Sequence, residues 1–187
     1  MRKILKIVLI VLTVLIISGI ASLGLIVSDV AGNMATESKA LPNGAAIGKA
    51  LVVYDPGLSG GAKDVATKIG YSLQSSGYYV TLAGVKSSAA ANITGYQVIV
   101  VGGPIYAGKP ASSIQSYLNE LNPLQKTKVG AFGFGSVKIN NNDKTAVTQD
   151  VAPLPNGSSV YLNAVVKITS QDDIDNLCSD FVNRLLQ

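Results

Sequence analysis

The chain has 187 residues and a formal charge of +4, with no His, no Trp and a single Cys. Without His, neither a Ser-His-Asp nor a Cys-His nucleophile system nor an imidazole metal site can be built, and one Cys excludes an intramolecular disulfide. Arg2, Lys3 and Lys6 precede every acidic residue, which leaves 15 − 3 = 12 basic and 11 acidic residues beyond them. We therefore expect no metal and no nucleic-acid partner, and we expect any chemistry to come from a cofactor.

The first element is an apolar segment. Residues 7–27, IVLIVLTVLIISGIASLGLIV, form a run of 21 residues without a charge, and a helix of that length spans roughly 30 Å, the thickness of a bilayer core. Residues 1–27 are thus expected to be a single-pass membrane anchor. The alternative is a secretory signal cleaved near residues 30–32, although the apolar part of such signals is usually shorter.

The basic residues around this segment predict its orientation. Three lie before it, whereas Lys39 is the one basic residue in the 18 residues that follow residue 27. The positive-inside rule then places the N-terminus in the cytoplasm and the rest of the chain outside, at the cell membrane. Residues 28–48 are small and polar without clear periodicity, and they are interpreted as a flexible linker of roughly 25 Å.

The domain is expected to occupy residues 49–187, where apolar runs alternate with helical patterns. Val65, Ile69 and Leu73 recur at helical spacing before Gly77, and a second helix opens at Pro110. Residues 85–94 are too short for a substantial helix. A last helix is expected to start at a Ser170-x-x-Asp173 pattern, with Cys178 in its apolar stripe and hence in the core. Five strands are expected: 50–54, 78–84, 96–103, 128–135 and 159–168.

These strands are apolar on both faces and are separated by helices. That pattern is typical of a parallel sheet covered on both sides, so we predict one doubly wound α/β domain with a five-stranded parallel sheet. Ligands of such sheets lie beyond the carboxyl ends of the strands. In the loop after the first strand, Gly57, Gly60 and Gly61 precede a helix and fit a phosphate cradle, but glycines in such a turn also arise for purely steric reasons.

Two stretches resemble the flavodoxin family. The sequence ALVVYDPGLSGGAKDVATKI is similar to its first strand, phosphate loop and first helix, and VIVVGGPIYAGKPASSIQSYL is similar to its third strand, flavin loop and following helix. The resemblance covers residues 49–186 in element order. It implies strand order 2-1-3-4-5 and flavin mononucleotide (FMN) as the cofactor.

The resemblance also implies where FMN binds. The phosphate is expected on Ser59, Gly60, Gly61 and Ala62, and the isoalloxazine ring against the loop that holds Tyr106. The expected cofactor-binding residues are Ser59, Gly60, Gly61, Ala62, Pro104, Ile105, Tyr106, Ala107, Gly108, Lys109, Gly133, Phe134 and Gly135. Phe134 and Ile139 are expected to close the other side of the ring.

Two residues have alternative interpretations. Tyr106 either stacks on the flavin or is a turn residue half covered by its neighbours. Asp55 either turns into its own loop as the acceptor of an Asx-turn, is neutralised by Lys63, or faces the phosphate and repels it. The Pro56-Gly57 pair that follows Asp55 favours the Asx-turn.

The leading hypothesis is a membrane-tethered flavodoxin-like protein that binds FMN and exchanges electrons with a redox partner the sequence does not identify. An alternative is a flavin-free flavodoxin-like domain with a binding or structural role. A third option is a small FMN-dependent quinone or porphyrin oxidoreductase. No nicotinamide domain and no acid/base pair stand out, which favours a carrier over a complete enzyme.

Overall fold

The computed structural model describes residues 10–14 and 34–187. Residues 10–14 are helical, and their apolar side chains are more than half exposed, from 52% at Val11 to 64% at Ile10. Within the described residues, no helix is both long enough and apolar enough to span a bilayer. The predicted anchor, residues 1–27, lies outside the described residues except for positions 10–14.

A parallel sheet forms the centre of the domain, in the strand order that the resemblance to the flavodoxin family implied. The order β3-β2-β4-β6-β7 corresponds to the predicted 2-1-3-4-5, and all four neighbouring pairs are parallel. The bounds of these strands are β2 Gly48–Tyr54, β3 Tyr78–Gly84, β4 Val98–Tyr106, β6 Lys128–Phe134 and β7 Leu162–Ile168.

The sheet has seven strands rather than the predicted five. β1 (Ser38–Leu41) pairs antiparallel with β3 at the edge of the sheet. β5 (Lys109–Pro110) pairs antiparallel with the end of β4. The sequence did not reveal either strand, because one has two residues and the other buries only its last side chain, Leu41.

β1 lies inside the segment that was expected to be a flexible linker. Ala35 and Leu41 are buried, at 5% and 4% exposure. The carbonyl oxygens of Ala35 and Glu37 accept hydrogen bonds from Lys86 N and Gly84 N. The part of residues 28–48 from Ala35 onward therefore belongs to the folded domain, because its backbone bonds to the end of β3 even though most of its side chains stay exposed.

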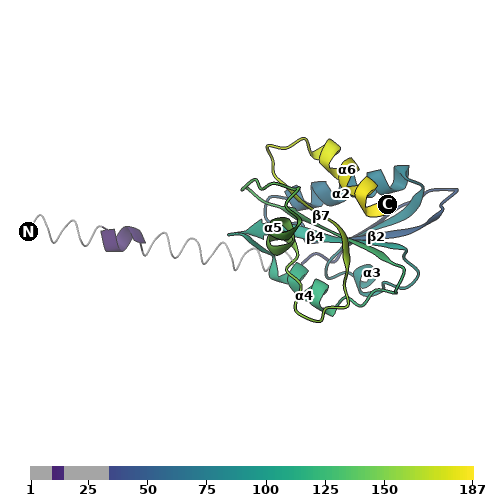
Figure 1. Ribbon diagram of the computed structural model, residues 1–187, viewed down its shortest axis with the longest axis horizontal. Coiled ribbons are helices and arrows are strands. Elements are labelled where there is room, and N and C mark those ends of the chain that lie inside the picture. Colours follow the sequence, from purple (N-terminus) through teal and green to yellow (C-terminus); the bar gives the residue numbers. More distant parts are fainter. Residues whose placement is uncertain (1–9, 15–33) are drawn as a thin grey trace, which may run out of the picture.

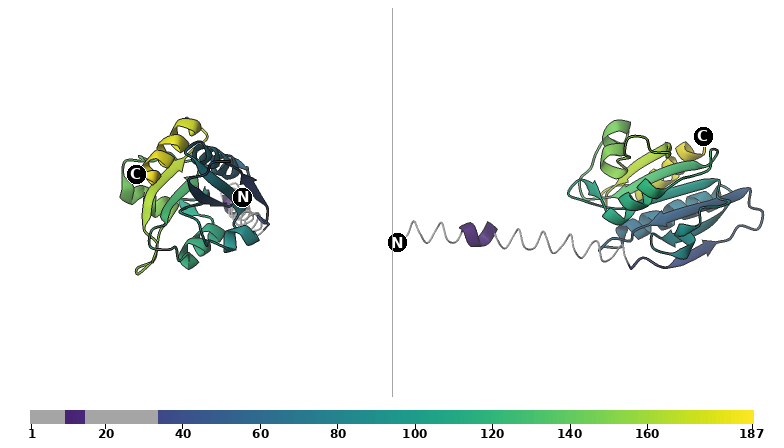
Figure 2. Two further views of the ribbon diagram at one scale, coloured as in Figure 1. Left: turned by 90° about the vertical axis from the view of Figure 1, so that its right-hand side faces the viewer. Right: turned by 90° about the horizontal axis from the view of Figure 1, so that it is seen from below.

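Helices cover both faces of the sheet. In Figure 1, α2 (Gly61–Ser75) and α6 (Ile174–Leu186) lie above the sheet, and α3 (Ser88–Ala91) and α4 (Ser112–Glu120) lie below it. Turned by 90°, the left view of Figure 2 shows α6 on one side of the strands and the teal helices on the other. The doubly wound arrangement is thus confirmed, and α3 is as short as expected.

The regions after β6 differ from the sequence-based expectation. α5 (Lys144–Val151) was not predicted, because it buries only Val147 and Val151, one turn apart. α6 begins at Ile174 rather than at Ser170. Its cap is Asp173, which accepts a hydrogen bond from Asn176 N. Strand β7 begins at Leu162, three residues later than expected.

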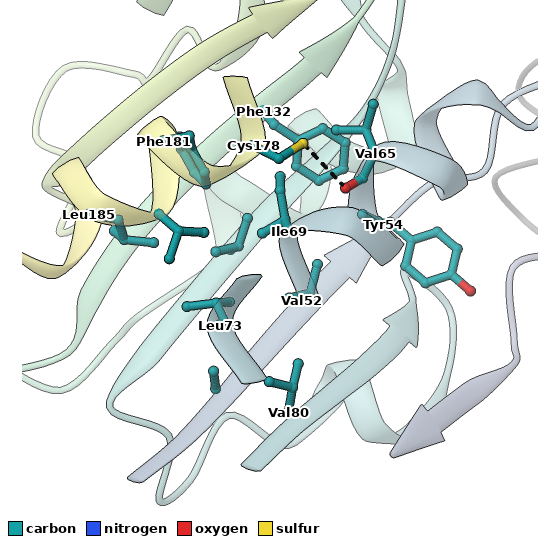
Figure 3. Close-up of a cluster of buried hydrophobic side chains, with 14 of the residues drawn as sticks. Val52, Tyr54, Val65, Ile69, Leu73, Val80, Phe132, Cys178, Phe181 and Leu185 are labelled. Atoms are coloured by element: carbon teal, nitrogen blue, oxygen red, sulfur yellow. Dashed lines mark hydrogen bonds between the residues drawn. The ribbon is translucent and has the colours of Figure 1, made fainter. Parts of the chain in front are cut away.

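The core between α2, α6 and the sheet is closely packed (Figure 3). Val65, Ile69 and Leu73 of α2 meet Phe181 and Leu185 of α6, and all five are completely buried. Cys178 lies among them with its Sγ 4.0 Å from Val65 O (Figure 3). Burial raises the pKa of its thiol to about 12. The prediction that Cys178 is a core residue is confirmed, and the thiol stays protonated and unreactive near neutral pH.

Candidate functional site

Three loops meet at the edge of the sheet where the parallel strands end. They follow β2, β4 and β6, which end at Tyr54, Tyr106 and Phe134. We call this edge, with the loops that follow these strands, the carboxyl edge. It is the place where a doubly wound sheet holds its ligands, and all thirteen predicted cofactor-binding residues lie on or next to it.

The first loop is shaped by Asp55, whose side chain is completely buried. Its Oδ1 accepts a hydrogen bond from Gly57 N at 2.9 Å, and its Oδ2 accepts one from Ser113 Oγ. This is the predicted Asx-turn. The alternative in which Lys63 neutralises Asp55 is not observed, because Lys63 pairs with Glu37. The carboxylate therefore points into the fold and away from the surface of the loop.

The N-terminus of α2 presents backbone donors next to open space. Gly60 is the N-cap, with a left-handed φ of 75° and no side-chain capping hydrogen bond. An added Cβ at Gly60 would meet nothing within 4 Å. Ser59 is exposed, and its Oγ accepts a long 3.4 Å hydrogen bond from Gly61 N. Because the first N–H groups of a helix have no partner within the helix, this turn favours an anion.

Tyr106 links the third-strand loop to the first loop. Its hydroxyl accepts a hydrogen bond from Leu58 N at 3.2 Å, and the side chain is half-buried. A Cβ on Gly57 would lie 3.0 Å from Pro104 and 3.3 Å from the Tyr106 hydroxyl. Gly57 also has a φ of 65°, so both the close approach and the backbone require glycine there.

Beyond Tyr106 the chain turns back tightly. Ala107 and Gly108, with φ of 49° and 74°, form the two-residue turn between β4 and β5, as expected for a hairpin whose central residues both have positive φ. Ala107, Gly108 and Lys109 are exposed. Residues 106–109 therefore form a short, tight hairpin that lies beside the first loop.

Phe134 lies on the same face of the sheet as Pro104, its cross-strand partner, and therefore as Tyr106. A Cβ on Gly61 would lie 2.3 Å from the Phe134 ring, so the ring rests directly on the first turn of α2. Ile139 is half-buried and packs in the core on the opposite face of the sheet. The structure thus brings Phe134 to the first turn of α2, whereas Ile139 packs against the cluster that contains Ile105, and its contact with the ring stays a prediction.

The other predicted residues of this loop pack inward. Cβ atoms on Gly133 and Gly135 would lie 2.4 and 3.2 Å from Ile105. Both glycines therefore allow Ile105 to fill the space beneath the hairpin. Ile105 is itself buried, at 9% exposure. These three residues pack beneath the hairpin and support it from below, and Gly135 N donates its hydrogen bond to Ile168 O.

Sequence reasoning missed a buried ion pair behind these loops. Lys167, near the end of β7, has a side chain only 3% exposed and pairs with Asp150 of α5. Cβ atoms on Gly135 and Gly108 would lie 3.3 Å from Lys167 Cε and 3.5 Å from Asp150 Oδ1. The signal was present as a single charged residue in an otherwise apolar strand, since a lysine is almost never buried unless it is paired.

The site is a surface formed by loops. Grooves of about 420 and 700 Å³ lie between α3 and α4 and between α2 and α6, and neither is lined by residues of the first loop or the hairpin. At the carboxyl edge, the open space at Gly60, the exposed Ser59 hydroxyl and the inward turn of Asp55 fit a phosphate. The exposed hairpin beside them fits the edge of a flat ring, so the residues present are compatible with FMN.

Comparison with solved structures identifies the class of fold. The chain superposes on flavodoxin 2 from Bacillus cereus with a TM-score of 0.51 and 19% identity, covering 74% of this chain and 97% of that one. A flavodoxin from Streptococcus pneumoniae TIGR4 gives a TM-score of 0.54 at 14% identity, with 74% and 97% covered. A short-chain flavodoxin associated with a PDU bacterial microcompartment gives 0.54 at 16%, with 74% and 95% covered.

A fourth structure contains a similar fold within a larger protein. The chain matches rubredoxin oxygen:oxidoreductase from Desulfovibrio gigas with a TM-score of 0.51 and 17% identity, covering 74% of this chain but 36% of that one. No family model matches the chain, and no curated protein matches it in sequence. The protein therefore has a flavodoxin-like fold, and its particular activity has to be inferred from the site.

Proposed function

We propose that this protein is a flavodoxin-like electron carrier that binds FMN at the carboxyl edge of its sheet and is held at a membrane by residues 1–27. The observation that supports it best is the N-terminus of α2. There Gly60 borders open space, Ser59 exposes a hydroxyl, and Asp55 is turned away into hydrogen bonds with Gly57 N and Ser113 Oγ.

Each loop has its own task in this proposal. Ser59, Gly60, Gly61 and Ala62 hold the phosphate through backbone N–H groups and the Ser59 hydroxyl, as a helix N-terminus does. The flavin supplies the one- and two-electron chemistry when it is bound. Tyr106, Ala107 and Gly108 border the ring, and Lys109 adds a positive charge that favours a negatively charged reduced ring. Residues 97–119 contain no Asp or Glu to oppose it.

The membrane attachment rests on the uncharged run at residues 7–27 and on the exposed apolar side chains of the helical residues 10–14. The excess of Arg2, Lys3 and Lys6 over Lys39 favours a cytoplasmic N-terminus and an external domain. Protease added to intact cells should then remove the domain. Full protection until lysis would reverse the proposed orientation.

Titration of the purified full-length chain with FMN tests the cofactor. We expect the wild-type chain to bind FMN more tightly than riboflavin, because riboflavin lacks the phosphate. Gly60→Asp adds a negative charge where the phosphate is placed, in a left-handed conformation that Asp tolerates, and should weaken FMN binding at least tenfold. Gly157→Asp is the matched control, because Gly157 also has a positive φ, of 82°, and open space around it. Equal FMN affinity for both variants would contradict the proposed phosphate site.

A flavin-free binding domain is the second candidate, and one observation favours it. The chain already fills part of the site with its own groups, since Phe134 covers Gly61 and the Tyr106 hydroxyl takes up Leu58 N–H. If the wild-type chain takes up no FMN and Phe134→Ala restores binding, the Phe134 ring closes the site and the second candidate replaces the first.

A further inference from the structure

The carboxyl edge exposes large apolar side chains. Leu58, in the loop after β2, is 51% exposed, and Val137, in the loop after β6, is 67% exposed. Met34, which precedes β1 and lies next to the end of β3, is 75% exposed. Water-exposed methionine and branched aliphatic side chains at one edge are typical of a surface that meets an apolar partner.

Two lysines accompany them. Lys86 and Lys109, in the loops after β3 and β4, are exposed, and the structure gives neither of them an ion pair within residues 34–187. Several acidic groups at this edge are already used within the fold. Asp55 is buried, and Glu37 and Asp172 pair with Lys63 and Lys138. Asp64, on the first turn of α2, and the helix N-caps Asp143 and Asp173 remain as exposed carboxylates at the same edge.

Exposed apolar groups alone do not single out this edge. Ile47, Leu124 and Tyr161, at the opposite edge where the parallel strands begin, are 75%, 69% and 77% exposed. What distinguishes the two edges is the place where the chain enters the domain. Ala35 O accepts a hydrogen bond from Lys86 N at 2.9 Å, and a Cβ on Gly84 would lie 2.3 Å from the same oxygen. The chain therefore enters at the carboxyl edge.

The connection to the apolar run is also short. Because residues from Ala35 onward are part of the fold, only residues 28–33 separate the uncharged run at 7–27 from Met34. Six residues reach at most about 20 Å even when fully extended. A domain tied this closely by its carboxyl edge keeps that edge near the membrane, and the opposite edge lies one strand length further away.

We infer that the carboxyl edge rests on a lipid surface with anionic headgroups, in the same membrane that holds residues 7–27. Met34, Leu58 and Val137 lie at the headgroup level, and Lys86 and Lys109 meet the anionic lipids, as basic residues next to a membrane segment do. The inference rests on the membrane attachment proposed above and is independent of FMN. If FMN is bound as proposed, its site opens toward the bilayer.

Quenching by brominated lipids tests which edge meets the membrane. The full-length chain with Leu58→Cys carries an environment-sensitive dye and is reconstituted into vesicles of neutral lipid with about one third anionic lipid. Leu124→Cys is the matched control, since it is also an exposed leucine but lies at the opposite edge. Cys178 is fully buried and should stay unlabelled, which the unsubstituted chain checks. We expect brominated lipids to quench the dye at residue 58 at least threefold more than at residue 124.

Charge reversal tests the lysines. Lys86→Glu with Lys109→Glu should reduce quenching at residue 58 at least twofold in anionic vesicles and leave it unchanged in neutral ones. Lys49→Glu with Lys126→Glu, at the opposite edge, is the control and should change neither. Equal quenching at residues 58 and 124, or failure of the chain to float with the vesicles, would overturn the inference. Preferential quenching at residue 58 in a chain that binds no FMN would support the lipid surface and refute only the flavin proposal.

Discussion

Two carboxylates near the carboxyl edge, one buried and one partly buried, have different kinds of partner. Asp55, after β2, is completely buried and accepts hydrogen bonds from two uncharged donors, Gly57 N and Ser113 Oγ. Asp150, on α5, is 22% exposed and pairs with the buried ammonium group of Lys167 on β7. The hydrogen bonds of Asp55 shape the loop after β2 and link it to α4, whereas the ion pair of Asp150 links α5 to β7.

The two arrangements differ in the kind of group that stays unpaired when one partner is removed. A neutral donor that loses Asp55 becomes an unpaired polar group, which costs about 1–3 kcal/mol. A charged group that loses its partner is left in a poorly hydrated place, and breaking a buried ion pair in this way typically costs about 3–5 kcal/mol. The region around α5 and β7 should therefore be the more sensitive one, and substitutions at both places can test that ranking.

The largest effect is expected for Lys167→Met. The substitution keeps the length of the side chain but leaves Asp150 without its cation, so we expect a loss of about 3 kcal/mol of unfolding free energy, measured by urea denaturation. Lys167→Met combined with Asp150→Leu removes both charges and should recover most of the loss. A single variant as stable as the wild type would show that Asp150 is hydrated well enough to need no partner.

Asp55→Ala is expected to cost less, about 2 kcal/mol, because it leaves Gly57 N–H and the Ser113 hydroxyl unpaired. Asp55→Asn keeps an acceptor for Gly57 N and should cost about 1 kcal/mol. FMN affinity should change less than threefold in Asp55→Asn, since the carboxylate faces inward. A hundredfold tightening would mean that the carboxylate faces the phosphate and would contradict the observed hydrogen bonds.

The third effect is expected at Gly61 and Phe134, where the first turn of α2 meets the end of β6. A methyl group on Gly61 would lie 2.3 Å from the ring, so Gly61→Ala has to displace it and should cost about 1.5 kcal/mol, within the usual range for overpacking. Phe134→Leu in the same chain should relieve that cost. If Gly61→Ala is neutral on its own, the ring moves freely and does not close the first turn of α2.

The smallest effect is expected at the partly exposed acid Glu37. Hydrogen bonds from Lys63 and from the Tyr54 hydroxyl lower the pKa of its carboxyl group. A carboxyl whose pKa is lower in the folded state stabilises the fold above its unfolded pKa and loses that contribution as the pH falls through its folded pKa. Glu37→Gln should therefore reduce stability by about 0.5 kcal/mol at pH 7, as surface pairs do. Its stability should approach that of the wild type near pH 3, and a constant difference at both pH values would contradict this origin.

The sequence predicted the parts of the fold whose signals are local. The five central strands contain apolar runs, so their number in the parallel core was recognisable, whereas their order was implied by the resemblance to the flavodoxin family. The Asx-turn of Asp55 followed from the Pro56-Gly57 pair. β1 and the Lys167–Asp150 pair were not predicted. Both depend on contacts between distant segments, and a strand with one buried side chain or a lone lysine in a strand gives no partner by itself.

In the candidate site, too, the local features were predicted and the contacts between distant residues were not. Glycines 57, 60 and 61 indicated a helix N-terminus suited to an anion, and the structure brings these residues together. That Tyr106 would bond to Leu58 N and that Phe134 would rest on Gly61 could not be predicted, because these contacts depend on which face of the sheet each side chain takes after its strand ends.

The pairing of β1 with β3 also bears on self-association. An uncovered edge strand presents a row of free N–H and C=O groups to which a strand from another molecule can add. β1 occupies that row on β3 from Ala83 to Val80, with Lys39 exposed on its own outer side. A chain truncated before residue 42 would expose Tyr78–Gly84, a strand rich in aromatic and aliphatic residues. Such a truncated protein should form strand-paired oligomers, detectable by size-exclusion chromatography, because the segment that leads out of the domain would no longer cover the edge of β3.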